Sequence, residues 1–223
     1  MNCLFGVSVL VIALSVLSGS VTGQSTNPPA TTPVNCSDAT MMSNIDISAL
    51  YGTWYEVARQ PSIGAACIEV DIGGSSQSTD IVYVNTTYAS NMNMLNQNKT
   101  VSQTFNKTLA TANGSITLYS NISSTNYLFK VLSTDNTNYA FVCGYTSNNS
   151  SSIGVILTRT RYVNATYLGN LEAQAAINYS DFSATSMYTI TQNEGCVVSG
   201  AATLVPFISL LTALVYSLMK FLN

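Results

Sequence analysis

The fold assignment rests on the segment Gly52-Thr53-Trp54-Tyr55-Glu56-Val57-Ala58-Arg59, which contains the only tryptophan of the 223-residue chain. Residues 53–57 are rich in β-branched and aromatic types, and this composition predicts a β-strand. Gly52 comes just before the strand and suits a tight turn in which no side chain fits. A tryptophan at a strand start is most often a core residue, so the segment predicts the first strand of a β-rich domain.

Seven further segments with apolar or alternating residues follow this strand at the spacing of hairpins. They cover residues 67–72, 80–88, 101–111, 115–119, 126–133, 139–145 and 153–160. Turn residues separate them, and Asn113-Gly114 is a strong signal for a two-residue hairpin loop. Eight successive strands without helices between them indicate a barrel or a sandwich.

The pattern changes after Asn164, and this change favours a barrel over a sandwich. Asn164 is a suitable N-cap, and the apolar residues that follow recur near the helical spacing. These residues are Tyr167, Leu168, Leu171, Ala175 and Ile177. A short strand over residues 187–191 follows the predicted helix. Immunoglobulin-like sandwiches do not have a single helix and a short strand after their last main strand.

Two sequence motifs resemble those of the lipocalin family. The first strand of that family carries Gly-x-Trp, here Gly52 and Trp54. The whole run Trp-Tyr-Glu-Val-Ala-Arg is most similar to the apolipoprotein D and insect Lazarillo branch. A second motif of the family is similar at Thr134 and Asp135, although Asn136 stands where the family usually has Tyr.

A third motif is similar at Arg159, which follows the last predicted barrel strand. In the family this arginine stacks over the first-strand tryptophan, so the resemblance implies a cation–π contact between Arg159 and Trp54 worth about 0.5 to 2 kcal/mol. Arg161 could stack over Trp54 instead, but Arg159 is in the better register relative to the last predicted strand. We expect a helical turn at 46–51 to close the base of the barrel and Arg59 to point outside it.

The resemblance covers roughly residues 36–196 and implies an all-β fold. The expected architecture is an eight-stranded antiparallel up-and-down β-barrel with one C-terminal helix packed outside. Residues 4–17 form an apolar run that predicts a secretory signal peptide over 1–23, with an N-terminal membrane anchor as the alternative. A flexible Ser/Thr/Pro segment over 24–35 leads into the domain, and a hydrophobic tail covers 197–223.

Cleavage of the predicted signal peptide would remove Cys3 and leave four cysteines: Cys36, Cys67, Cys143 and Cys196. An even number in an oxidising compartment predicts two disulfides in one of three possible pairings. The resemblance implies the pairs Cys36–Cys143 and Cys67–Cys196. Metal binding is the competing interpretation, but the sequence has no Cys-x-x-Cys pair and no histidine, so we expect neither a metal nor a cofactor.

Charged residues make up only 8% of the chain, and the net charge is −3. The sequence has no basic patch, so we expect no nucleic-acid partner. A soluble protein with so few charged residues needs another source of solubility. The Asn-x-Ser/Thr sequons predict that glycans supply it. The sequons are at Asn35, Asn85, Asn98, Asn106, Asn113, Asn121, Asn148, Asn149, Asn164 and Asn178. Asn148 and Asn149 are adjacent and cannot easily both be occupied.

The tail has two interpretations, both of which attach the protein to a membrane. Residues 201–219 are almost wholly apolar and long enough for a transmembrane helix. Such helices usually continue into a segment with several basic residues, and here the apolar run is followed by one basic residue, Lys220. Small residues from Ser199 onward fit a glycosylphosphatidylinositol signal, with a spacer shorter than usual. Lazarillo-type lipocalins are anchored in this way, so we expect a glycolipid at Ser199.

An eight-stranded barrel is wide enough to hold one small ligand, and side chains alternate between its lumen and its outside. Six residues are predicted to point into the lumen and bind the ligand: Tyr83, Tyr127, Phe129, Val131, Val142 and Val155. Any one of them could instead pack under the helix on the outer face. We expect the carboxylates of Glu56, Glu69 and Asp71 to be surface or rim groups.

The sequence gives little support for catalysis. Without histidine there is no Ser-His-Asp triad and no histidine base, and Cys67 is better explained as half of a disulfide than as a reactive thiol. The resemblance therefore implies a secreted or cell-surface protein, not an enzyme, that binds a lipid, retinoid, pheromone or pigment for transport or sequestration. The alternative is a glycolipid-anchored recognition glycoprotein of Lazarillo type with a cell-surface receptor.

Overall fold

The computed structural model describes residues 32–90, 92–93, 95, 98–119, 127–146, 151–183, 185 and 187–196. The predicted signal peptide, most of the Ser/Thr/Pro segment, the tail with Ser199, and the sequons at Asn121, Asn148 and Asn149 lie outside these residues. Within the described ranges no helix has both the length and the apolar character needed to cross a bilayer.

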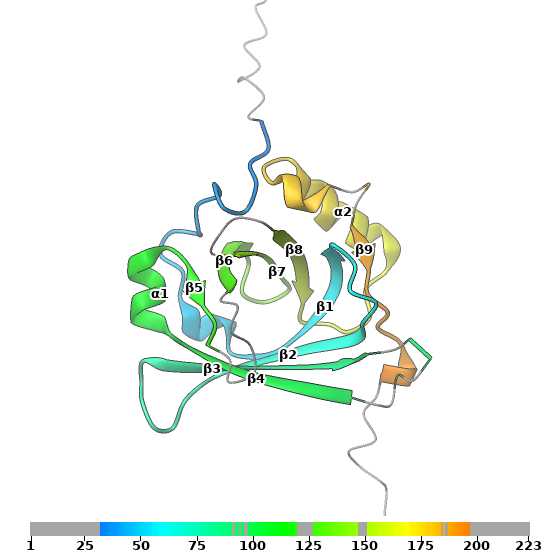
Figure 1. Ribbon diagram of the computed structural model, residues 1–223. Coiled ribbons are helices and arrows are strands. Elements are labelled where there is room, and N and C mark those ends of the chain that lie inside the picture. Colours follow the sequence, from blue (N-terminus) through cyan, green and yellow to red (C-terminus); the bar gives the residue numbers. More distant parts are fainter. Residues whose placement is uncertain are drawn as a thin grey trace, which may run out of the picture. The chain divides into compact units, whose positions relative to one another are not determined.

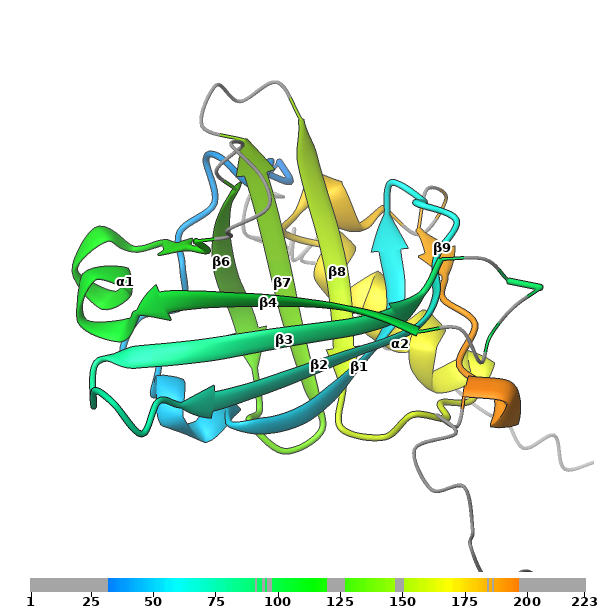
Figure 2. The same ribbon diagram turned by 60° about the horizontal axis from the view of Figure 1, so that its bottom comes forward.

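Eight antiparallel strands form a nearly closed barrel, in the order β4-β3-β2-β1-β8-β7-β6-β5 (Figure 1). Strands β2 to β4 cross β6 to β8, so the two halves of the sheet lie over each other (Figure 2). Two backbone hydrogen bonds of 3.0 and 3.3 Å between Thr104 and Tyr119 join β4 to the segment after β5. The strands are β1 (Gly52–Gln60), β2 (Ala66–Gly74), β3 (Ile81–Ala89), β4 (Asn98–Asn106), β5 (Ile116–Thr117), β6 (Tyr127–Thr134), β7 (Tyr139–Thr146) and β8 (Ser152–Thr158). The expected up-and-down barrel is therefore confirmed.

Helix α1 (Lys107–Asn113) was not expected, because the sequence predicted a strand over 101–111 and a hairpin at Asn113-Gly114. The side chain of Asn106 caps this helix by accepting a hydrogen bond of 2.9 Å from the backbone N–H of Leu109. Gly114 ends it in the left-handed conformation, with φ 63°. An Asn-Gly pair suits a helix end as well as a hairpin, so the local pattern did not distinguish them.

Helix α2 (Ala165–Ala176) begins after Asn164, as predicted, and packs outside the barrel (Figure 1). Its apolar face lies against the outer side of β1, β7 and β8 together with the 3-10 turn η2 (Ser180–Phe182). The short strand β9 (Tyr188–Thr189) pairs with β1. Ile177 lies beyond the helix end and is exposed, so its predicted place on the apolar face is wrong. The cluster under the helix contains Val57, Ala58, Phe141, Ile156, Leu168, Leu171, Ala175 and Phe182.

One end of the barrel is closed by the 3-10 turn η1 (Ile47–Leu50) and Trp54. The Trp54 side chain is completely buried, and its indole Nε1–H donates a hydrogen bond of 2.8 Å to the carbonyl of Leu50. The guanidinium of Arg159 lies 3.7 Å from the centre of the Trp54 ring. Arg159 also donates to the carbonyls of Thr53 (3.1 Å) and Ala49 (3.2 Å), so it ties η1 and β1 together.

Gly52 and Arg161 complete this end of the molecule. Gly52 has φ 98°, and a Cβ at this position would lie 3.3 Å from Nη1 of Arg159. A side chain there would be both strained and crowded. Arg161 does not stack on Trp54 but lies over the ring of Tyr55, at 4.3 Å, and pairs with Glu69 on the outer face.

The turn between β6 and β7 is held by Asp135, whose Oδ1 accepts hydrogen bonds from the backbone N–H groups of Thr137, Asn138 and Tyr139. Burial opposes ionisation, but these bonds and one from the Asn138 side chain outweigh it and lower the pKa of Asp135 to about 2. Asn136 has φ 65°, a conformation that Asn tolerates better than Tyr.

Two disulfides and a lysine fasten the ends of the described chain to the barrel. Cys36–Cys143 and Cys67–Cys196 are bridged, with Cα–Cα distances of 5.7 and 5.1 Å. Cys196 lies in the 3-10 turn η3 (Glu194–Cys196). The ammonium of Lys130 donates to the carbonyls of Cys36 (3.1 Å), Ser37 (2.9 Å) and Ala39 (2.7 Å), which holds the N-terminal arm against β6. Both pairings are those that the family resemblance implied.

Candidate ligand-binding site

The barrel contains a cavity of about 200 Å³ whose wall is mostly aliphatic and aromatic. All eight barrel strands contribute residues to this wall; β6 contributes Phe129 and Val131, and β7 contributes Ala140 and Val142. Four of the six predicted lumen residues line it: Phe129, Val131, Val142 and Val155. Trp54 and Leu50 form its wall at the closed end.

The structure places Tyr83 outside the barrel, contrary to the prediction. Its neighbours Val82 and Val84 are both buried in the inner core, so strand alternation directs Tyr83 outward. There it pairs across the sheet with Gly73, and its ring occupies the space that a side chain on Gly73 would need. The register of β3 was one residue away from the one that the prediction assumed.

Tyr127 does not line the cavity either. It is the first residue of β6, its side chain is 38% exposed, and its ring centre lies 6.3 Å from that of Phe129. Alternation puts Tyr127 on the same face of β6 as Phe129. Tyr127 therefore has the predicted direction but lies beyond the cavity, at the end of the strand.

Two charged residues that the sequence placed outside the lumen line the cavity instead. Glu56 and Arg59 are only 5% and 9% exposed, and both face the cavity. The register between β1 and β8 shifts between Glu56 and Ala58. This β-bulge interrupts the alternation, so Val57 and Ala58 both pack on the outer face and Arg59 turns inward. The expectations that Arg59 lies outside and that Glu56 is a surface or rim group are wrong.

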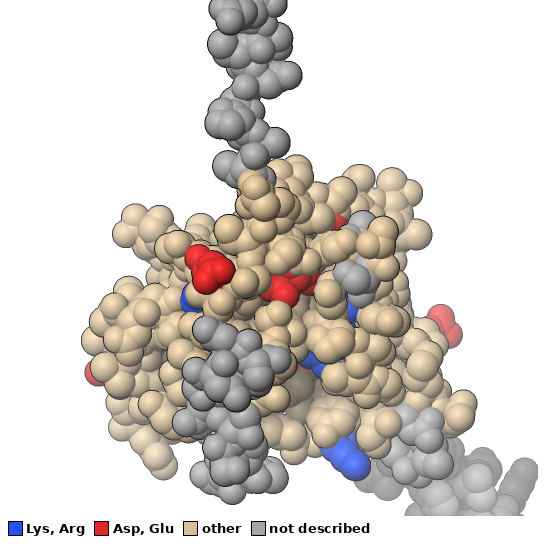
Figure 3. Space-filling model, turned by 45° about the horizontal axis from the view of Figure 1, so that its top comes forward, with Lys and Arg blue, Asp and Glu red and all other residues tan. Residues whose placement is uncertain are grey.

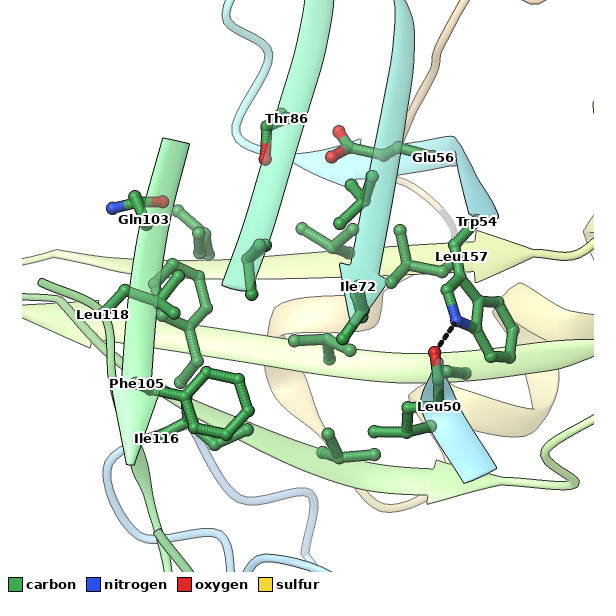
Figure 4. Close-up of a pocket in the computed structure, with 18 of the residues that line it drawn as sticks. Leu50, Trp54, Glu56, Ile72, Thr86, Gln103, Phe105, Ile116, Leu118 and Leu157 are labelled. Carbon is green, nitrogen blue, oxygen red and sulfur yellow. Dashed lines mark hydrogen bonds between the residues drawn. The ribbon is translucent and has the colours of Figure 1, made fainter. Parts of the chain in front are cut away.

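Strict alternation from Trp54 is a signal that would have found Glu56, because residues two apart on a strand share a face. Arg59 could not be found in this way, since the bulge is visible only in the pairing of β1 with β8. The uncharged polar residues at the cavity, Thr86 and Gln103, were also missed. Figure 4 shows them with Glu56 toward one end of the cavity, whereas Leu50 and Phe105 lie toward the other.

Glu56 and Arg59 form an ion pair inside the barrel, with 2.9 Å between Oε1 and Nε. The two atoms are close enough for a hydrogen bond but not oriented for one, and neither has a hydrogen-bond partner in the described part of the chain. Burial raises the pKa of the Glu56 carboxyl from 4.5 to about 7, while the positive charge of Arg59 limits the rise. The cavity therefore has one polar point with unused donor and acceptor capacity.

The burial of Glu56 predicts a pH-dependent stability. Since the pKa of Glu56 is higher in the folded protein than in the unfolded chain, the folded state binds more protons between about pH 4.5 and 7. The free energy of unfolding should fall as pH rises through this window, by about 3 kcal/mol for a shift of about 2.5 units. Glu56→Gln should remove this dependence in urea titrations at a series of pH values. Glu69→Gln, outside the barrel, should retain it, and a loss in both variants would contradict the assignment.

The other expected carboxylates do not join Glu56. Glu69 pairs with Tyr55 across β1 and β2 and therefore lies on the outer face, where its Oε2 is 2.5 Å from Nη2 of Arg161. No group of three or more His, Cys, Asp or Glu residues in the described ranges could hold a metal ion. Over the rest of the surface charges are sparse, and Figure 3 shows only scattered charged side chains on the face that it draws.

No protein-family model and no curated protein matches the chain. Solved structures do match its fold. Insecticyanin from the tobacco hornworm Manduca sexta has a TM-score of 0.55 and 17% identity, over 75% of this chain and 91% of that one. The allergen Per a 4 from cockroaches has a TM-score of 0.52 and 18% identity, over 71% of this chain and 96% of that one. Apocrustacyanin C1 has a TM-score of 0.52 and 16% identity, over 67% and 81%. At such identities the likeness concerns the fold, which is the lipocalin fold.

Proposed function

We propose that this chain, a protein of lipocalin fold, is a secreted or cell-surface carrier that binds one small apolar molecule inside its barrel. The observation that carries the proposal is the cavity of about 200 Å³ with its largely aliphatic and aromatic wall. Such a wall binds a ligand by removing apolar surface from water, worth about 25 cal/mol per Å² before the cost of association. Transport or sequestration of that molecule is the function that follows.

The size of the cavity limits the ligand. Sites for drug-sized molecules usually measure about 300 to 1,000 Å³, whereas this cavity measures about 200 Å³. Trp54 and η1 close one end, so the ligand enters from the end at which Glu56 and Thr86 lie. A small or slender apolar molecule fits these limits better than a bulky one.

The proposal is tested by organic extraction of the protein purified from its native source, with mass spectrometry of what is released, followed by titration of the emptied protein. Trp54 lines the cavity and is the only tryptophan, so its fluorescence reports ligand binding directly.

Val142→Phe fills the cavity from β7 and should weaken binding at least about tenfold, as expected when an added ring excludes the ligand. Thr87→Phe on the outer face is the matched control. Equal affinity in the two variants would contradict a lumen site.

We also propose that the protein is held at the cell surface by a glycolipid at Ser199, in the manner of the Lazarillo branch that its sequence resembles. The support is the apolar run over 201–219 behind the small residues that begin at Ser199, and two disulfides of the kind found in extracellular proteins. Phosphatidylinositol-specific phospholipase should release the folded protein from intact cells. Retention of the protein, with tail peptides detected in its mature form, would contradict the anchor and indicate a transmembrane segment.

Glycans would then cover the exposed part of the domain. Asn35, Asn113, Asn164 and Asn178 are exposed and suit glycosylation. Asn98 does not, because its side-chain Nδ2, the atom that would carry the sugar, is buried. The half-buried residues Asn85 and Asn106 lie between these cases.

A further inference from the structure

We infer that the open end of the barrel docks on the neutral lipid bilayer to which the C-terminal tail is attached. The docking surface is the mouth rim, which comprises residues 61–65, the described residues of 90–99, and residues 187–196. This is a second binding surface, distinct from the lumen, with a lipid bilayer as its partner. The inference rests on the proposed membrane attachment of the tail, and it holds for a glycolipid and for a transmembrane segment alike.

The Cys67–Cys196 disulfide fixes the point at which the chain leaves the described structure. Cys67 is the second residue of β2, and its neighbour Ala66 pairs with Ala89, the last residue of β3. Strand β2 therefore begins, and β3 ends, at the end of the barrel opposite to its closure by η1 and Trp54. The bridge thus holds Cys196 at the mouth of the barrel.

The distance from Cys196 to the membrane is short. The predicted attachment site, Ser199, is three residues beyond Cys196, and the apolar run begins at residue 201. Three fully extended residues span at most about 11 Å. The tether therefore brings the mouth rim, and not the closed end, close to the bilayer.

The mouth rim exposes large apolar side chains on three segments that lie together. Leu95 of the β3–β4 loop packs on the Cys67–Cys196 bridge, and Ile190, just after β9, packs against Ala65 of the β1–β2 loop. Figure 2 shows β9, the β3–β4 loop and the turn η3 on the same side of the molecule. The exposed side chains, one on each segment, are Ile63 (57%), Met92 (58%) and Tyr188 (55%).

The charges of the mouth rim indicate a neutral bilayer. Lys99 and Glu194 are the only charged residues among its described residues, and their opposite charges balance. Attraction to anionic lipids usually requires a cluster of several Lys or Arg residues, so docking here depends on the burial of apolar side chains. Of the sequons at described positions only Asn98 lies in the rim, and no glycan is expected there because its Nδ2 is buried.

Docking at the mouth has a consequence for the lumen. The cavity opens at the same end, where Glu56 and Thr86 lie. An apolar molecule can then pass between the bilayer and the lumen without crossing water, which makes the bilayer the source of the ligand. This consequence rests on the proposed carrier function, whereas docking itself does not.

The test places a tryptophan in the mouth rim of the full chain, which is purified with its tail and held in phosphatidylcholine vesicles with brominated acyl chains. Bromine quenches a tryptophan that it contacts, and the wild type gives the background from Trp54. The added fluorescence of Ile63→Trp should fall about twofold or more, because interfacial apolar groups reach about 5–10 Å into the bilayer. Leu109→Trp is the matched control. Leu109 is 53% exposed on α1, beyond the other end of β4, and a tryptophan there should not be quenched.

A longer tether separates docking from mere proximity. A Gly/Ser linker of about ten residues after Cys196 adds about 17 Å of reach, and Ile63→Trp in this longer chain should still be quenched. Met92→Glu in the same chain should reduce the quenching toward the level of Leu109→Trp, since a charged side chain enters a bilayer unfavourably. Added salt should not weaken the quenching, because the rim has no net charge.

The outcomes separate this inference from the carrier function. No quenching at position 63, or equal quenching at positions 63 and 109, overturns docking by the mouth. Loss of quenching in the longer chain also overturns it, because the tether alone then explains the contact, and so does quenching that requires phosphatidylserine in the vesicles. If the full chain does not stay with the vesicles, the membrane attachment and the inference are both contradicted. None of these results concerns binding in the lumen, which extraction and titration test separately.

Discussion

Replacement of Trp54 by alanine should lower the free energy of unfolding by about 3 to 5 kcal/mol, the range for large truncations in a core. Trp54 is completely buried between η1 and the inner faces of the strands. Its removal leaves a void at the closed end, takes the aromatic surface from under Arg159, and leaves the carbonyl of Leu50 without its donor. All three losses act at the same place, so relaxation of one does not restore the others.

Urea denaturation followed by far-ultraviolet circular dichroism measures this loss, because the variant has no tryptophan fluorescence. Trp54→Phe is the matched control, since it keeps an aromatic face for Arg159 and removes the hydrogen bond to Leu50. Its loss should be smaller, about 1 to 3 kcal/mol. An alanine variant whose midpoint stays near that of the wild type would show that Trp54 does not close the barrel.

Removal of the Cys36–Cys143 disulfide by two alanine substitutions should lower the free energy of unfolding by about 4 to 5 kcal/mol. The bridge spans 107 residues, and a loop of this length strongly restricts the unfolded chain. In the folded protein the arm keeps other contacts, since Lys130 binds three of its carbonyls and Asp181 accepts a hydrogen bond of 2.7 Å from the backbone N–H of Cys36. The native structure should therefore survive, and the effect should arise mainly in the unfolded state.

Urea titration under oxidising conditions tests this origin, because a less restricted unfolded chain exposes more surface and increases the dependence on urea. Alanine at both Cys67 and Cys196 is the comparison. That bridge spans 129 residues, and the cost of loop closure grows only slowly with length, so the loss should be similar. A loss below about 1 kcal/mol with an unchanged slope would contradict the chain-entropy account.

The elements that the sequence predicted well depend on neighbouring residues. The composition of residues 53–57 indicated β1, and Asn164 with the apolar spacing behind it indicated α2. The same local rules failed at Asn113-Gly114, where a helix end and a hairpin turn require the same left-handed glycine. They failed at Tyr83 because a register shift of one residue exchanges the two faces of a strand.

Local sequence was thus sufficient for most of the strands, the outer helix and the even set of cysteines, since each depends on composition and spacing along the chain. The family resemblance added the up-and-down barrel, the disulfide pairs and the contact of Arg159 with Trp54. The polar point of the cavity depends on contacts between distant segments. Arg59 faces inward because β1 bulges against β8, about a hundred residues away, and Glu56 becomes hard to ionise because the closed barrel removes it from water. Alternation along β1 is enough to turn Glu56 inward, but the bulge that turns Arg59 inward exists only where β1 pairs with β8, and the burial that affects Glu56 exists only in the closed barrel.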